Sequence, residues 1–393
     1  MTWPHPRPPE LSHPPEPVVE DQTPGLYLRN NKKFTLAIFS DLHFGEEEHG
    51  WGINQDINST RVMNTVLDKE PSVDLVVLNG DLITGENTFK ENSSAYVDQI
   101  VVPMVSRNIP WASTYGNHDS KFNLSREAIL QAEKKYALSY TRQMGQGLPG
   151  VTNYYLLVQT GDGRPVAVIW FFDSRGGASY QQDPSGQDDL PNWVADETAA
   201  WFTAASRKIR SRYGRLPSIA FVHIPPHPFL AAQEAGLDPA HFPGLNEDVP
   251  VAIQGKGDSD DGFVDALLGE EGQLLHSIYV GHDHGDAWCS VWPVSRPRGR
   301  RRHDEMIAGG GGDDEEHSGP FLCFSRHTGY GGYGTWDRGS RIVQLSFEDT
   351  DGDGLLDDDD ELRVDTWVRM ESGKSIARVS LNETYGSDVY EGD

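Results

Sequence analysis

The chain has 393 residues and a formal net charge of -27, with 33 basic and 60 acidic side chains. A surface this acidic repels nucleic acids and anionic membranes, so we exclude both as expected partners. Hydrophobic residues make up 37% of the chain, enough for a large buried core, and we therefore expect a globular protein. No run approaches the roughly 18 consecutive apolar residues that span a membrane.

The first 24 residues contain eight prolines, so we predict that residues 1–33 form a disordered proline-rich tail. Residues 34–385 are expected to form a single domain. Two segments interrupt its pattern of apolar runs, and we predict insertions there. They are 225–262, rich in proline, glycine and aspartate, and 293–319, a basic block followed by glycines and an acidic block.

Hydrophobic periodicity predicts the regular elements in chain order. Strands are expected at 34–39, 73–78, 109–112, 154–159, 166–172, 218–222, 277–280, 321–325, 341–347 and 363–370. Helices are expected at 59–70, 94–107, 123–136, 196–213 and 263–268. Strands alternate with helices over the first 220 residues, which predicts an α/β fold. The later strands, joined by short loops, suggest a second sheet packed on the first.

Five of the predicted strands end in small groups of polar residues. These groups are Asp41-x-His43, Gly80-Asp81, Gly116-Asn117-His118, His223 and Gly281-His282-x-His284. In open α/β sheets ligands bind at the carboxyl ends of the strands, so we expect the groups to meet at one sheet edge. The glycines at 80, 116 and 281 are interpreted as tight turns that release the chain from the sheet.

The expected site offers seven oxygen and nitrogen donors and no thiolate. They are Asp41, His43, Asp81, Asn117, His223, His282 and His284. Seven donors are too many for one tetrahedral zinc ion and suit two metal ions about 3.5–4 Å apart. Asp81 stands alone at its strand end and is the natural carboxylate to bridge them. Iron, manganese and zinc all accept this donor set.

The ordered set of five groups, spanning residues 34–284, resembles the calcineurin-like metallophosphoesterase superfamily. Four further segments are similar to a fungal and plant phosphatase group that includes the yeast cell-cycle-regulating phosphatase and non-purple relatives of purple acid phosphatases. They are Leu78–Thr84, Phe172-Asp173-Ser174-Arg175, His223–His227 and Arg326-His327-Thr328-Gly329-Tyr330.

The resemblance implies a four-layer sandwich of the α+β type, with two central mixed β-sheets flanked by helices. It assigns Asp41, His43, Asp81 and His284 to one metal ion. It assigns Asp81, Asn117, His223 and His282 to the other. Purple enzymes have a tyrosine ligand where this chain has Thr84, so we expect no tyrosinate-to-iron colour.

We therefore expect a metal-dependent phosphatase that hydrolyses phosphomonoesters, with phosphoproteins among the candidate substrates. A metal-bridging hydroxide would attack phosphorus, and His118 would act as the general acid. Asp119 is a candidate to orient the His118 imidazole, or else it caps the next turn. Two alternatives stay open: a phosphodiesterase acting on a small-molecule diester, and a non-catalytic binding protein on the same scaffold.

Other positions carry weaker signals. Arg175 and Arg326 are candidate phosphate contacts, with surface ion pairs as the alternative. His227 is either a loop residue or a substrate contact, and the glycine-rich run 329–334 is interpreted as a flexible turn near the cleft. An acidic stretch has the oxygen spacing of a calcium loop, and it is either a Ca²⁺-stapled hairpin or an acidic hairpin tip. Its candidate ligands are Asp349, Asp351, Asp353, Asp357 and Asp360.

The signals for cellular location conflict. The N-terminus has no signal-peptide pattern, which favours the cytoplasm. Four glycosylation patterns, at Asn58, Asn92, Asn123 and Asn382, point instead to a secreted or vacuolar protein. Cys289 and Cys323 are either one disulfide or two free thiols. A monomer is the default expectation.

Overall fold

The computed structural model describes residues 25–29, 32–180, 190–272, 274–293, 319–348 and 361–391. Most of the predicted proline-rich tail, most of the 293–319 insertion and the whole predicted calcium loop at 349–360 lie outside the described residues.

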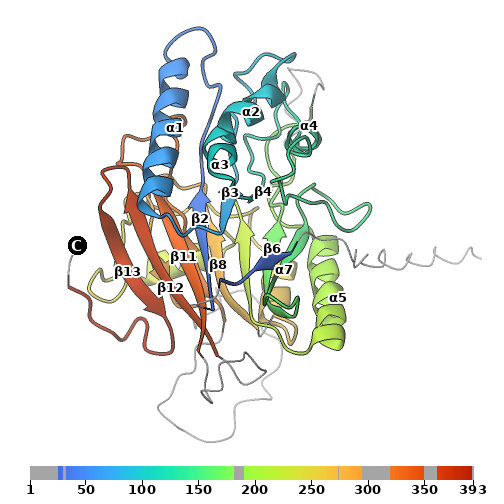
Figure 1. The fold of residues 1–393 in the computed structure, drawn as a ribbon, viewed down its shortest axis with the longest axis vertical. Helices are drawn as coiled ribbons and strands as arrows, with labels where there is room; N and C mark the ends of the chain where they lie inside the picture. The colour runs from blue at the N-terminus through green and yellow to red at the C-terminus, as the bar shows by residue number, and fades with distance from the viewer. Residues whose placement is uncertain are drawn as a thin grey trace, which may run out of the picture.

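Two mixed β-sheets form the centre of the molecule (Figure 1). The six-stranded sheet has the order β13 (Ser375–Leu381), β12 (Glu361–Met370), β11 (Gly339–Glu348), β2 (Lys33–Phe39), β3 (Leu75–Asn79) and β4 (Trp111–Thr114). The seven-stranded sheet has the order β1 (Leu26–Tyr27), β5 (Tyr154–Gln159), β6 (Pro165–Phe172), β7 (Ser218–Val222), β8 (Leu275–Val280), β10 (Phe321–Phe324) and β9 (Cys289–Ser290). The strands β2, β3 and β4 run parallel, as do β6, β7 and β8.

Alternating side chains along the strands build separate core layers. On β2, Leu36 and Ile38 pack into the core between the sheets with Phe171 and Phe221 of the other sheet. Ala37 and the last residue of β2 face the opposite way, toward the helices. This period of two places one apolar face of each sheet against its partner and the other against helices.

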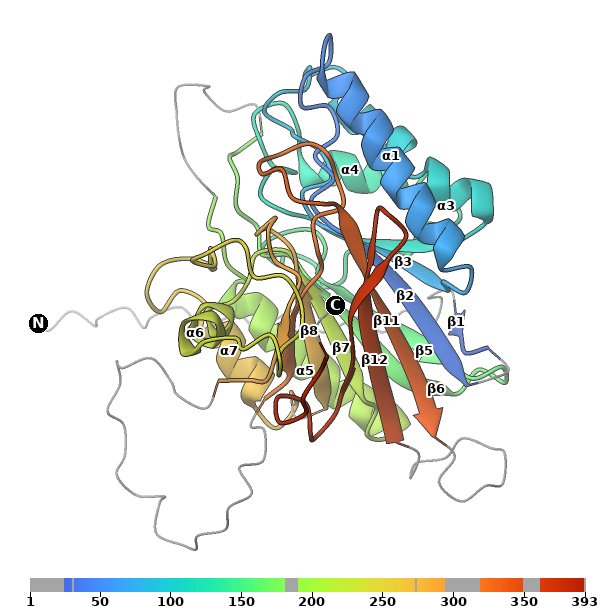
Figure 2. The same ribbon diagram turned by 90° about the vertical axis from the view of Figure 1, so that its left-hand side faces the viewer.

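Helices cover both outer faces (Figures 1 and 2). The six-stranded sheet is covered by α1 (Gly52–Lys69), α2 (Tyr96–Ile100), α3 (Val102–Arg107) and α4 (Arg126–Glu133), with the short 3₁₀ turn η1 (Ser93–Ala95). The seven-stranded sheet is covered by α5 (Asp196–Tyr213), α6 (Pro228–Ala235) and α7 (Asp261–Leu268). The predicted four-layer α/β sandwich is confirmed.

Three predictions about the elements were wrong in detail. The first helix begins at Gly52 rather than at Ser59. The helix expected at 94–107 is broken, because Pro103 lacks the amide hydrogen needed to continue the ladder from α2 into α3. The strands β11, β12 and β13 do not form a separate sheet; they extend the sheet of β2, β3 and β4.

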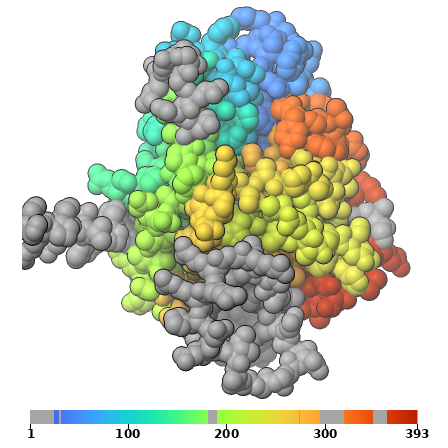
Figure 3. All heavy atoms as spheres, turned by 180° about the vertical axis from the view of Figure 1, so that it is seen from behind, coloured from blue at the N-terminus to red at the C-terminus, as the bar shows by residue number. Residues whose placement is uncertain are grey.

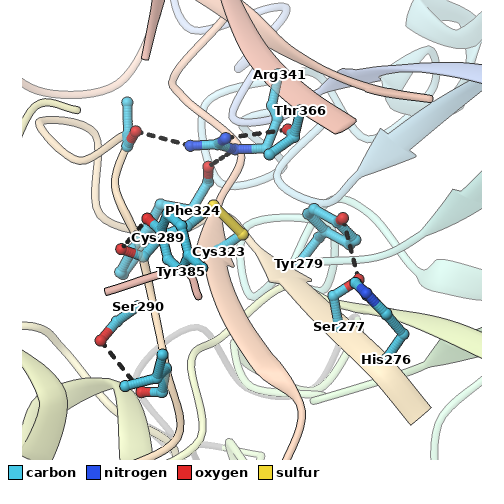
Figure 4. The surroundings of a disulfide bond; sticks show 12 residues. His276, Ser277, Tyr279, Cys289, Ser290, Cys323, Phe324, Arg341, Thr366 and Tyr385 are labelled. Atoms are coloured by element: carbon cyan, nitrogen blue, oxygen red, sulfur yellow. Dashed lines mark hydrogen bonds between the residues drawn. A yellow bond between two sulfur atoms is a disulfide. The ribbon is translucent and has the colours of Figure 1, made fainter. Parts of the chain in front are cut away.

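A disulfide joins Cys289 and Cys323, which lie directly opposite each other on β9 and β10. Figure 4 shows the bridge beside Tyr385, whose hydroxyl donates a hydrogen bond to the carbonyl of Cys289 at 2.9 Å. Disulfides persist in oxidising compartments, so the bridge is compatible with a secreted protein. Within the described parts of the chain, no helix has the length and apolar character needed to cross a membrane.

Candidate metal centre

The predicted ligands lie where the carboxyl ends of the two sheets meet. Three of the five polar groups follow β2, β3 and β4 of one sheet, and two follow β7 and β8 of the other. The expectation of a single sheet edge was therefore wrong. The two sheets face each other, and hydrogen bonds such as that from Asn79 Nδ2 to the carbonyl of Tyr279, at 3.4 Å, join them near these ends.

Six of the predicted ligands form two compact groups of side chains. One contains Asp41, His43 and His284, and the other contains Asp81, His223 and His282. Within each group the potential ligand atoms all lie within 4.8 Å of one another. Each group takes residues from both sheets, because one of its histidines always follows β8.

Two atoms at these groups are buried but have no hydrogen-bond partner: Nε2 of His43 and Oδ1 of Asn117, the seventh predicted ligand. Nε2 of His223 has the carboxylate of Asp81 beside it, at 3.0 Å. A buried polar atom without a partner is unfavourable, and a bound cation would satisfy both of the unpartnered atoms. Nitrogen and oxygen donors without thiolates suit manganese, iron or zinc. The residues present therefore fit a pair of metal ions.

Asp81 faces both groups. Its Oδ2 lies 3.0 Å from His223 Nε2 and 3.9 Å from His43 Nε2. Its other oxygen, Oδ1, accepts a 2.7 Å hydrogen bond from the backbone amide of His118. This position between the groups is the one that a bridging carboxylate requires.

Four of the predicted ligands have strained backbone conformations. Asp41, His43, Asp81 and His282 have φ angles of 56°, 50°, 48° and 78°, in the left-handed region that residues with a side chain rarely adopt. Such conformations cost of order 1–3 kcal/mol each and cluster at functional sites. Composition and periodicity carry no signal for them.

The glycines of the site are needed more for the close approach of neighbouring loops than for left-handed φ angles. Only Gly80 has a left-handed φ, 86°, among the three glycines interpreted as tight turns. A side chain at Gly116 would come within 3.0 Å of Asp81, and one at Gly281 would come within 3.0 Å of Asp41. Close approach of the loops therefore explains these two positions.

Three imidazoles are oriented by a hydrogen bond at Nδ1. The partners are the Thr84 hydroxyl for His43 at 3.2 Å, the Asn79 carbonyl for His223 at 2.9 Å, and the Tyr333 carbonyl for His284 at 2.8 Å. A carbonyl acceptor places the proton on Nδ1, which leaves Nε2 available to a metal ion. Thr84, at the position of the tyrosine ligand in purple enzymes, thus supports His43.

Burial and neighbouring charges shift the pKa values of the ionisable groups at the site in different directions. Burial raises the pKa of Asp41 to about 6 and lowers the pKa of His282 and of His284 to about 3. Burial also opposes protonation of His223, but the carboxylates of Asp81 and Asp41 outweigh it and raise its pKa to about 10. His282 and His284 are therefore neutral, which is the form that binds metal ions, whereas His223 would have to release a proton when an ion binds.

The partner of His118 is Glu86, which the sequence analysis did not identify. Glu86 Oε1 lies 2.7 Å from His118 Nδ1. Asp119 does not take this place, because its carboxylate accepts hydrogen bonds from the backbone amides of Leu82, Ile83 and Gly116 at 2.9–3.2 Å. Asp119 was expected either to orient His118 or to cap the next turn; its hydrogen bonds instead join the loops that follow β3 and β4.

The three candidate substrate contacts have partners within the protein. Arg326 is 2% exposed, and its guanidinium donates to the carbonyls of Asp337 and Gly285. Its Nη1 also lies 3.8 Å from Oε2 of the exposed Glu247, so the guanidinium is engaged within the protein, including an ion pair. Arg175 is partly buried and donates from Nε to the Trp193 carbonyl at 2.9 Å. His227 lies 2.9 Å from Asp260 and groups with Asp260 and Asp261 rather than with the predicted ligands.

The glycine-rich run 329–334, interpreted as a flexible turn, packs directly on the centre. Gly329 donates its amide hydrogen to the carbonyl of Asp41 at 3.2 Å, and Gly332 has no room for a side chain beside His284.

Two facing sheets with donors for two ions at their carboxyl ends define the class of dinuclear metal-dependent hydrolases. A calcineurin-like phosphoesterase family profile matches residues 34–286, more than half of the chain, and the chain belongs to this family.

Several known proteins are similar to this chain. "Probable inactive purple acid phosphatase 29" from Arabidopsis thaliana is 23% identical, and the match covers 80% of this chain and 77% of that protein. "Phosphatase DCR2" from Saccharomyces cerevisiae is 24% identical over 65% of this chain and 45% of its own length. The crystal structure of a dimetal phosphatase from Danio rerio aligns with a TM-score of 0.48 and 13% identity, over 89% of this chain and 99% of that one. The predicted resemblance to the fungal and plant phosphatase group is confirmed by the plant and yeast relatives.

Proposed function

We propose that this phosphoesterase hydrolyses phosphomonoesters, with His118 donating a proton to the leaving oxygen. Asp41, His43, Asp81 and His284 would hold one metal ion, and Asp81, Asn117, His223 and His282 the other. When bound, two such ions bind phosphate oxygens and lower the pKa of the attacking water.

The observation that carries the acid assignment is the position of His118. Its ring lies 4.9 Å from the ring of His43, yet its side chain is 30% exposed whereas those of His43 and His223 are at most 3% exposed. Of these three imidazoles, His118 is the one that an incoming substrate can reach.

The environment of His118 also favours the protonated form that an acid needs. Burial lowers its pKa, but the charges of Asp81 and Glu86 outweigh this and raise the pKa above its ordinary value. Glu86 also fixes the ring by its contact with Nδ1, so Nε2 is the nitrogen that would release the proton.

The test compares leaving groups. The metal-loaded protein and its His118→Ala and Glu86→Gln variants are assayed on alkyl phosphates and on nitrophenyl phosphate. Loss of a general acid typically costs about 10²–10⁴-fold when the leaving group needs a proton. We expect that loss in kcat/KM for His118→Ala on alkyl esters, a loss of less than about tenfold on nitrophenyl phosphate, and an intermediate effect for Glu86→Gln.

Other outcomes favour the alternatives. Equal losses on both ester types would rule out His118 as the acid. Faster turnover of bis-nitrophenyl phosphate than of the monoester would favour a phosphodiesterase. Three similar proteins from Arabidopsis thaliana are named probable inactive purple acid phosphatases. A protein that binds two ions and hydrolyses no ester would therefore favour a binding function.

A further inference from the structure

A segment that follows β10 lies against the metal centre, beside the loop after β2. Ser40 and His327 form a parallel backbone bridge, and Thr328 donates to the carbonyl of Ser40 at 3.0 Å. In Figure 3 the orange surface of this part of the chain lies between the blue surface of the early chain and the yellow surface of the later loops. The segment 326–334 is therefore part of the site's wall.

Close packing leaves this segment little freedom. Side chains at Gly331 and Gly332 would come within 3.0 Å of His43, and the one at Gly332 would also come within 3.0 Å of His284. The glycines thus allow the backbone to touch two of the predicted ligands.

The same segment holds the imidazole of His284 between two rings. The Tyr333 ring is stacked on it with centroids 4.0 Å apart and planes 16° apart. The His327 ring lies 3.8 Å away at 38°. Two rings this close to one imidazole cannot share a face, so they cover opposite faces of His284.

His327 itself has unused hydrogen-bonding capacity. It is 1% exposed, and neither of its ring nitrogens has a hydrogen-bond partner. A neutral imidazole carries one donor and one acceptor, and leaving both unpaired in a buried site is unfavourable. Its ring neighbours are the predicted ligands His284 and His43, the second at 6.4 Å. The missing partner is therefore expected on the side of the metal centre.

We propose that His327 is a further positioning residue of this centre. Its ring closes one face of His284, and one of its nitrogens would hydrogen-bond an oxygen ligand of the ion that Asp41, His43 and His284 would hold. His327 is not a member of that group of potential ligands, so its contact with the ion would pass through the oxygen ligand. The inference rests on the metal centre of the proposed function and not on ester hydrolysis.

The test measures binding in the full chain, without turnover. Co²⁺ is titrated into metal-free protein and followed by its visible absorption bands, first without and then with inorganic phosphate. His327→Phe keeps a ring on His284 but cannot hydrogen-bond, whereas His327→Gln keeps a hydrogen-bonding group. His276→Phe is the matched control, because His276 is a largely buried imidazole in β8 whose Nε2 contacts the Leu381 carbonyl at 3.1 Å.

We expect His327→Phe to weaken binding at least tenfold, while His327→Gln and the control stay within about threefold of the wild type; in energy, tenfold is about 1.4 kcal/mol. A loss in Co²⁺ affinity without phosphate identifies the oxygen ligand as solvent. A loss confined to phosphate affinity identifies it as a phosphate oxygen.

Unchanged affinities and spectra in His327→Phe would overturn the proposal, as would equal losses in the Gln and Phe variants. If His327→Phe does not fold, as judged by circular dichroism, His327→Leu takes its place because it is smaller and equally unable to hydrogen-bond. A protein that hydrolyses no ester still allows this test, and a negative result here leaves the phosphatase proposal untouched.

Discussion

At the scale of single residues, buried side chains around the centre differ in what they support. Asp119 is fully buried, and burial together with the nearby charge of Asp81 raises its pKa to about 7. Its carboxylate nevertheless satisfies three backbone amides in the loops that carry Asp81 and Asn117. Its role is to fix ligand positions, which is a different role from chemistry at the substrate.

Asp119→Ala is expected to destabilise the fold by about 3 kcal/mol, because it leaves buried amides without an acceptor. Asp119→Asn should cost less, since the amide oxygen still accepts a hydrogen bond. Urea unfolding of the metal-free proteins gives both values, with exposed Glu383→Ala as the control. A cost for Asp119→Ala no larger than that of the control would contradict this role.

His276 makes the stability of the fold depend on pH. Burial lowers its pKa from 6.5 to about 4. The unfolded chain binds a proton below about pH 6.5, but the folded chain does so only near pH 4. Stability is therefore complete above pH 6.5 and falls toward pH 4, by up to about 3 kcal/mol. The His276→Asn variant should lack this part of the loss when unfolding free energies are compared at pH 7 and pH 4.5.

At the scale of elements, the loops that follow the strands depend on glycines for their close approach. Gly116 after β4 lies against both Asp81 and His223. In contrast, Gly161 in the turn between β5 and β6 has open space around it and no left-handed φ.

Gly116→Ala should therefore displace Asp81 and leave fewer than two metal ions per chain after dialysis, measured by elemental analysis. We expect kcat/KM on nitrophenyl phosphate to fall at least 100-fold, about 2.7 kcal/mol in transition-state stabilisation. Gly161→Ala should change neither quantity. Two retained ions in Gly116→Ala would show that the loops can move apart without penalty.

An element is predicted well from the sequence when burial imposes a regular hydrophobic period on it. Long amphipathic helices such as α5 and apolar strands such as β7 were predicted with their observed bounds, because burial imposes a clear period. The strand β13 was missed although Ala377, Val379 and Leu381 alternate with Arg378 and Ser380, and α6 was missed inside a segment rich in proline and glycine.

The candidate site was partly readable from the sequence. The seven predicted ligands were identified because each follows an apolar run at a strand end, and the structure brings six of them into two compact groups. The supporting roles of Glu86, Thr84 and Tyr333 were missed, since these residues lie in loops at no fixed spacing from the residues they support. Strand pairing was also beyond the sequence, because local apolar runs do not specify that β11 pairs with β2, some three hundred residues away.

At the scale of the whole molecule, the disulfide stabilises the end of the seven-stranded sheet. Cys289 and Cys323 are separated by 34 positions in the chain, and closing a loop of this length is expected to contribute about 3–4 kcal/mol by restricting the unfolded chain. The Cys289→Ala, Cys323→Ala double variant should lose this amount in urea unfolding. If reducing agent shifts the unfolding midpoint of the wild type equally, the bridge is the cause.

Each group of predicted metal ligands contains residues from both sheets, and this has a consequence for the energetics of the molecule. Ligand geometry exists only when the sheets are packed in their native register, so ion binding and sheet packing are thermodynamically linked. A substitution deep in the intersheet core, such as at the stacked pair Phe171 and Phe221 with centroids 5.4 Å apart, would be registered as a change in metal affinity. The concentration of free metal ion would in turn change the free energy with which the two sheets pack together.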